Sequence, residues 1–167
     1  MLETALRDEA DRVHATAIAV GDRGVLIRGP SGSGKSDLAL RCLAHGPSAL
    51  LRDPVQLVAD DQVILKSDWS HGSLRLCATA PQTLRGKIEV RGVGILEVAV
   101  RDAVDIVLIA DIAREGAIER YPDPWPTVVL CGVKVPAIRL LPFESSAPLK
   151  IFAALDMAGL PRIEVKE

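Results

Sequence analysis

Short apolar segments alternate with polar turns along most of the chain, a pattern typical of β-strands. Residues 13–20 and 24–28 are rich in β-branched side chains, and the sequence Gly-Asp-Arg between them predicts a hairpin turn. In the segment 56–65, two further strands are predicted on either side of an Asp-Asp pair. The remaining predicted strands are residues 74–78, 88–90, 95–100, 104–110, 127–130, 133–135 and 138–141.

Helical spacing of apolar residues occurs in two places. Residues 36–46 present leucines and a cysteine on one helical surface, and Gly46 provides a stop. Residues 147–158 predict a second helix, which Gly159 and Pro161 would end. Two helices among many strands predict a mixed, strand-rich α/β fold rather than a long doubly wound sheet.

Length and composition favour a single globular domain spanning residues 1–167. The chain has 49% hydrophobic and 25% charged residues, as soluble globular proteins do. Its formal net charge of −2 gives no general attraction to nucleic acid. The apolar runs are far shorter than the roughly 20 residues that span a bilayer, and the N-terminus lacks a signal-peptide pattern. We therefore expect a cytoplasmic protein that binds neither nucleic acid nor membrane.

A phosphate-binding loop is the clearest chemical motif. It matches the pattern GxxxxGK[ST] in full and stands between a predicted strand and a predicted helix, as the mechanism requires. Backbone N–H groups of such a loop and the following helix N-terminus bind phosphate oxygens, while the lysine spans the outer phosphates and the last hydroxyl ligates Mg²⁺. The predicted nucleotide-binding residues are Gly29, Pro30, Ser31, Gly32, Ser33, Gly34, Lys35 and Ser36.

Asp60 and Asp61 follow the apolar run 57–59 and are expected at a strand end, where α/β folds place ligand sites. Adjacent carboxylates are usually solvated surface residues, but a phosphate loop needs an acidic group near its metal. Because neighbouring side chains of a strand point to opposite faces, the two should differ in role. One would hold the metal or its water shell, and the other would take a proton from an attacking hydroxyl.

Four other residues carry weaker signals. Glu89 and Arg91 would share one side of a strand that leads into two glycines, which is also what an exposed strand and turn look like. His14 lies in a predicted strand, where a lone histidine is more often structural. Arg120, in the sequence IERYPDP, would by itself be ordinary loop charge.

Together these residues resemble the HPr kinase/phosphorylase family, specifically its C-terminal catalytic domain, from about residue 13 to residue 159. The likeness lies in the order and spacing of the strand with His14, the phosphate loop, the LVADD segment at 57–61 and the IEVRGVGIL segment at 88–96. The last segment resembles the family signature, which is more specific than the loop.

The resemblance implies transfer of phosphate from ATP, or from pyrophosphate in some members, to a serine of the phosphocarrier HPr. It implies that Asp61 is the general base and Lys35 the phosphate-binding lysine. It further implies magnesium ligands at Ser36 and Glu89. Asp60 is a third candidate ligand, because one of the two adjacent carboxylates is expected to hold the metal or its water shell. His14 aligns with the family's active-site histidine, and Arg120 falls near its catalytic arginine.

The sequence departs from the family in two places. Only about a dozen residues precede the match, so the chain resembles the shortened form without the N-terminal domain. The family's PVRPGRN loop is replaced by LPFESSAP at 141–148, which lacks both arginines and leaves the reverse phosphorylase reaction open. Family members assemble as hexamers, which leaves a homo-oligomer open here as well.

The leading hypothesis is therefore a Mg-ATP-dependent protein serine kinase acting on HPr or a related carrier. Two alternatives stay open. A non-catalytic ATP-sensing module would bind nucleotide without turnover, and a P-loop kinase of a small molecule would share the donor chemistry but not the acceptor.

Overall fold

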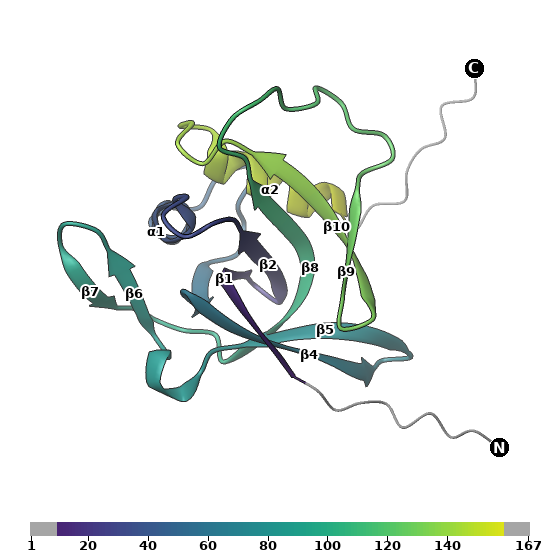
Figure 1. The fold of residues 1–167 in the computed structure, drawn as a ribbon, viewed down its shortest axis with the longest axis horizontal. Coiled ribbons are helices and arrows are strands. Elements are labelled where there is room, and N and C mark those ends of the chain that lie inside the picture. Colours follow the sequence, from purple (N-terminus) through teal and green to yellow (C-terminus); the bar gives the residue numbers. More distant parts are fainter. Residues whose placement is uncertain (1–9, 159–167) are drawn as a thin grey trace.

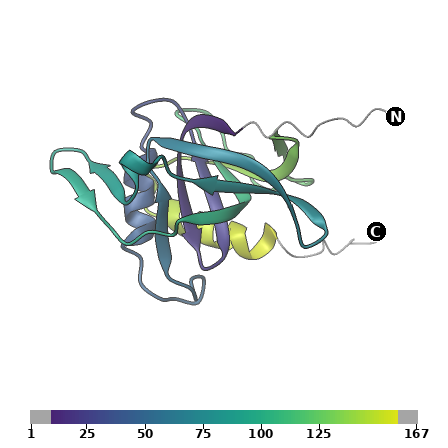
Figure 2. The ribbon, with the colours of Figure 1, turned by 90° about the horizontal axis from the view of Figure 1, so that it is seen from below.

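A computed structural model describes residues 10–158 of the chain. Eight strands form one curved sheet in the order β2-β1-β4-β5-β8-β10-β9, with β3 paired to β1, and two helices pack against it (Figure 1). A separate hairpin, β6–β7, projects away from this body (Figures 1 and 2). The elements are β1 (Asp11–Val20), β2 (Arg23–Arg28), α1 (Lys35–Leu43), β3 (Val55–Ala59), β4 (Gln62–Ser70), β5 (Ser73–Thr79), a short 3-10 helix (Gln82–Leu84), β6 (Lys87–Val90), β7 (Gly94–Glu97), β8 (Ala103–Ile112), β9 (Thr127–Leu130), β10 (Val133–Leu140) and α2 (Ala147–Ala158).

The sheet curls because β2, at one end of the strand order, also pairs with β8. β2 is antiparallel to β1 and parallel to β8, and β8 also pairs with β5 and β10. The mixed, strand-rich α/β fold predicted from the sequence is thereby confirmed. The predicted hairpin of residues 13–28 is confirmed by the antiparallel register of β1 and β2.

Strand alternation divides the buried side chains into two clusters. Along β1, Ile18 and Val20 pack with the helices, whereas Ala17 and Ala19 face the other side of the sheet. The first cluster includes Leu38 of α1 and is completed by α2. β2, which leads into the phosphate loop, is buried on both faces in the same way, with Val25 and Ile27 in the first cluster and Leu26 in the second. This packing gives the loop a firm support.

Two strand predictions were wrong in extent. Residues 133–135 and 138–141 were expected as separate strands, but β10 is continuous. Pro136 does not break it, because β10 pairs with β9 over residues 133–136 and with β8 only over residues 137–140. The strand expected at 95–100 ends at Glu97, since β7 pairs only with β6 and the chain then returns to the main sheet.

The helix predictions hold at α1 and α2, although α1 ends at Leu43, before the expected stop at Gly46. The predicted stop of the second helix, at Gly159 and Pro161, lies outside the described residues. Neither helix among residues 10–158 has the length and apolar character needed to cross a membrane.

Candidate active site

The phosphate loop joins β2 to α1, as the sequence predicts. Gly32 and Gly34 have φ angles of 72° and 99°, in the left-handed region that glycine adopts readily. Gly34 is also the N-cap of α1, and no side-chain cap accepts a hydrogen bond from the backbone N–H groups of the first turn. Such a helix start favours an anion.

Lys35 is folded back onto this loop. Its Nζ donates hydrogen bonds of 2.8 Å to the carbonyl oxygens of Gly29 and Pro30, and only 6% of the residue is exposed. Burial lowers the pKa of Lys35, while the nearby carboxylates of Asp61 and Asp60 oppose that shift. The ammonium group therefore lies in the loop, held by carbonyls that an incoming phosphate oxygen could replace.

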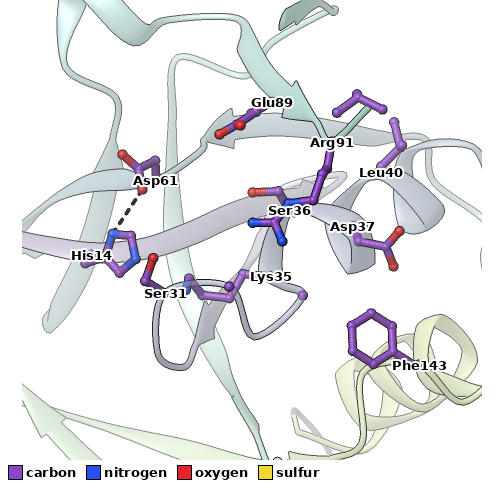
Figure 3. Close-up of a pocket in the computed structure, with 13 residues that line it drawn as sticks. His14, Ser31, Lys35, Ser36, Asp37, Leu40, Asp61, Glu89, Arg91 and Phe143 are labelled. Carbon is purple, nitrogen blue, oxygen red and sulfur yellow. Dashed lines mark ion pairs between the residues drawn. The ribbon is translucent and has the colours of Figure 1, made fainter. Parts of the chain in front are cut away.

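A pocket of about 310 Å³ opens beside the loop (Figure 3). Such a volume is at the lower end of the range typical of small-molecule sites. Charged and polar groups from several elements face it, together with three apolar side chains. Its lining consists of His14, Ser31, Gly32, Gly34, Lys35, Ser36, Asp37, Leu40, Asp61, Glu89, Val90, Arg91 and Phe143.

Asp60 and Asp61 follow β3 directly, and the structure separates their environments. Asp60 is 4% exposed, whereas the side chain of Asp61 is 62% exposed and lines the pocket. The expected difference in role stays a prediction, and the difference in environment does not come from strand alternation. Both lie in the turn between β3 and β4, and Asp61 has a φ of 66°.

Asp60 connects three parts of the fold. Its Oδ1 accepts hydrogen bonds from the hydroxyls of Thr16 (2.8 Å) and Ser36 (2.7 Å), and its Oδ2 accepts one from the backbone N–H of Glu89 (3.2 Å). Strand β1, the phosphate loop and β6 are thus tied to one carboxylate. Asp60 is not part of the pocket lining and is linked to the pocket through its hydrogen bonds with Ser36 and Glu89, which do line it. Sequence patterns gave no sign of the contribution of Thr16.

Asp61 faces a histidine of strand β1. His14 Nδ1 lies 3.0 Å from Asp61 Oδ1, with 47% of the histidine side chain exposed (Figure 3). The pairing of β1 with β4 sets this contact, because His14 is in register with Gln62, the neighbour of Asp61. A carboxylate at a pocket wall with an imidazole beside it can accept a proton in a defined orientation.

The structure does not gather every predicted residue at the pocket. Gly29, Pro30 and Ser33 belong to the loop but not to the lining, and the buried Ser33 hydroxyl has no hydrogen-bond partner among the described residues. Arg120 is exposed in the segment between β8 and β9 and does not line the pocket.

Another arginine of the same segment does reach the loop. Arg114 Nη2 donates a hydrogen bond of 3.2 Å to the Ser31 carbonyl oxygen. Sequence reasoning missed this residue because no motif marks it. The contact exists only because β8 runs parallel to β2, so both strands end at the same edge of the sheet.

Comparisons with known proteins agree with this geometry. The family described as HPr Serine kinase C-terminal domain matches residues 7–146. The HPr kinase/phosphorylase of Lactococcus lactis subsp. cremoris (strain SK11) is 32% identical over 142 residues, and that of Lactobacillus delbrueckii subsp. bulgaricus is 28% identical over 142 residues. Each alignment covers 79% of this chain but 42% of the relative, so the chain corresponds to less than half of those proteins.

A solved structure has a similar fold. The structure of the Hpr(Ser) kinase/phosphatase from Coxiella burnetii superposes with a TM-score of 0.68 at 25% sequence identity. The superposition covers 89% of this chain and 93% of the other. The likeness thus extends over nearly the whole of both chains.

Proposed function

The chain belongs to the HPr serine kinase C-terminal domain family, and we propose that it transfers the terminal phosphate of Mg-ATP to a serine of HPr or a related phosphocarrier. One observation carries the proposal. The phosphate loop and the Asp61–His14 pair face the same pocket, so a binding site for a phosphate donor and a proton acceptor lie side by side. Phosphoryl transfer needs mainly this positioning, together with neutralisation of charge.

The donor's phosphates would bind at the start of α1. Backbone N–H groups of residues 32–36 and the ammonium of Lys35 supply the positive side of the site. In this proposal Lys35 exchanges one of its loop carbonyls, at Gly29 or Pro30, for a phosphate oxygen. Its burial strengthens that contact, because electrostatic attraction is less screened away from water.

The side chains beside the loop suit Mg²⁺. Among residues 10–158 no three acidic, histidine or cysteine side chains are grouped as a metal cage, but Mg²⁺ usually takes one or two protein oxygens together with waters and substrate phosphates. The Ser36 hydroxyl and the Glu89 carboxylate, both in the pocket lining, would hold it, and Asp60 would orient Ser36. When bound, the ion neutralises charge on the transferring phosphate.

Asp61 would act as the general base. The acceptor serine gives its hydroxyl proton to a carboxylate oxygen of Asp61 as its oxygen bonds to the terminal phosphorus. The bond from that phosphorus to the bridging oxygen breaks, and the leaving nucleoside diphosphate keeps the electron pair. His14 holds Asp61 in place through the 3.0 Å contact.

The test mixes the purified chain, Mg²⁺, γ-labelled ATP and HPr from the same organism. We expect label on one HPr serine, lost in Asp61→Asn while ATP binding is retained. Absence of Asp61-dependent labelling across all carriers of that organism would refute the protein-kinase assignment. Tight ATP binding without transfer to any acceptor would instead support an ATP-sensing module, and transfer to a metabolite would support a small-molecule kinase.

Three further expectations remain predictions. They are a cytoplasmic location, an open question of self-association into a homo-oligomer, and a reverse phosphorylase reaction put in doubt by the replacement of the family's arginine loop. The reverse reaction is directly measurable. Serine-phosphorylated HPr, incubated with inorganic phosphate and the chain, would release pyrophosphate if that activity is retained.

A further inference from the structure

Phe143 is an exposed aromatic side chain in an unusual position. Its exposed fraction is 72%, and it belongs to the segment between β10 and α2. Isolated exposed apolar residues are common and by themselves mean little. Several other large apolar side chains of the described residues are equally exposed, including Trp69, Val93 and Tyr121, but Phe143 alone of these exposed residues lines the pocket.

The ring lies directly against the phosphate loop. A Cβ built on Gly34 would be 2.9 Å from Phe143 Cζ and 3.1 Å from Cε1, so close that the ring would have to shift. The left-handed φ of Gly34 separately favours glycine at this position. The edge of the aromatic ring borders the place where the loop enters α1.

The segment that carries Phe143 is fixed to the same helix. Arg41 of α1 donates hydrogen bonds to the carbonyl oxygens of Pro142 and Glu144, the two neighbours of Phe143 in the chain, and pairs with Asp37 at 2.9 Å. Lys150 of α2 pairs with Glu144. These contacts hold the backbone on both sides of the ring while leaving the ring itself exposed.

The residues that line the pocket differ from one end of it to the other. His14 and Asp61 lie at one end, Lys35 and Ser36 in the middle, and Phe143, with Asp37 and Leu40, at the other end (Figure 3). A nucleoside triphosphate bound with its terminal phosphate beside Asp61 extends past Lys35 toward the far end. Beyond its phosphates, such a ligand carries a sugar and a flat heteroaromatic base.

From this arrangement we infer that Phe143 forms the base-binding subsite of the donor nucleotide, with the half-buried Leu40 lining the same end of the pocket. The inference rests on the proposed use of ATP and names the group that would distinguish ATP from pyrophosphate. Stacking suits the site because every base has a π-face and an open aromatic ring can pack against it. Pyrophosphate has no base and would not contact the ring.

The decisive experiment measures the affinity of two ligands for each of three proteins. Binding of ATP and of pyrophosphate, each with Mg²⁺, is determined by calorimetry for the unaltered chain, Phe143→Ala and Trp69→Ala. We expect Phe143→Ala to weaken ATP binding about tenfold, the effect of losing one base–aromatic stack, and Trp69→Ala to leave it unchanged. Pyrophosphate binding should be unchanged in both variants, which also shows that the phosphate loop of Phe143→Ala is intact.

A second variant gives a spectroscopic readout. In Phe143→Trp the new indole should be quenched by ATP and not by pyrophosphate, measured against the same titration of the unaltered chain, whose own tryptophans are Trp69 and Trp125. ATP affinity should stay within about threefold of the original, since the stacking surface is kept.

The possible results separate this inference from the proposed function. If the unaltered chain binds ATP and Phe143→Ala binds it equally well, the base subsite is refuted and the kinase proposal stands. Equal loss of ATP and pyrophosphate binding would show a structural role and refute the subsite. A raised KM for HPr with unchanged nucleotide binding would assign the ring to the acceptor and also refute it. A chain that binds pyrophosphate but not ATP would refute both proposals.

Discussion

His14 Nδ1 lies 3.0 Å from Asp61 Oδ1, across the pairing of β1 with β4. The two residues are distant in the sequence, and each is about half exposed at the wall of the pocket. The contact pairs the histidine with a carboxylate that sits in a left-handed turn and has no hydrogen bond among the described residues. We therefore expect the histidine to hold this carboxylate in place.

Replacing His14 should therefore slow turnover without affecting donor binding. For His14→Ala we expect kcat to fall by about tenfold to a hundredfold, because a misplaced base loses the alignment with the acceptor hydroxyl. The KM for ATP should be unchanged. Steady-state kinetics with HPr as acceptor measures both quantities, and an equal rise in the KM for ATP would contradict a role confined to Asp61.

Lys35 and Asp61 should have separable effects. Lys35→Ala should weaken ATP and pyrophosphate binding, because it removes the ammonium that is held against the loop carbonyls. Asp61→Asn should leave binding intact and lower turnover by about a hundredfold or more, the usual contribution of a general base. Nucleotide titrations beside turnover assays make the comparison, and equal loss of binding in both variants would argue against separate roles.

Asp60 should matter for stability as well as for the site. Its carboxylate is buried and accepts three hydrogen bonds, so Asp60→Asn would place an amide N–H₂ against at least one donor. We expect a loss of about 1–3 kcal/mol in the free energy of unfolding.

The matched control for Asp60 is its neighbour. Asp61→Asn makes the same chemical replacement at an exposed carboxylate. It should change the free energy of unfolding by less than about 0.5 kcal/mol. Urea titrations of the two variants beside the unaltered chain decide the matter. Equal stability of both variants would mean that the Asp60 network does not hold the loop, β1 and β6 together.

Arg114 and Arg120 provide a second matched pair, since both lie in the segment between β8 and β9. Arg114→Ala removes the hydrogen bond to the Ser31 carbonyl oxygen and should weaken ATP binding by roughly threefold to tenfold. Arg120→Ala should leave ATP affinity unchanged, because Arg120 does not line the pocket.

The assignment of Arg120 as a catalytic arginine rests on resemblance and is tested by the same variants. If that role is correct, Arg120→Ala lowers kcat with HPr present although it leaves ATP affinity intact. Reduced ATP affinity in Arg120→Ala but not in Arg114→Ala would reverse the expectation drawn from the structure.

Much of the fold and of the phosphate site could be predicted from the sequence because the signals are local. A strand, a glycine-rich loop and a helix are contiguous between residues 23 and 43, and their spacing alone predicts a phosphate cradle. The position of Asp60 and Asp61 directly after a strand could also be predicted from the sequence. The extent of the strands was less predictable, because β7 ends where its pairing with β6 ends, and β10 stays continuous by pairing first with β9 and then with β8.

Contacts between distant residues came from the tertiary fold alone. The register of β1 against β4 brings His14 to Asp61, and the parallel alignment of β8 with β2 brings Arg114 to the loop. The turn after β10 sets Phe143 against Gly34. The phosphate-binding motif needed no such information, since it is read along a continuous stretch of backbone. The surroundings of the phosphate depend on contacts between segments far apart in the chain, which no local pattern specifies.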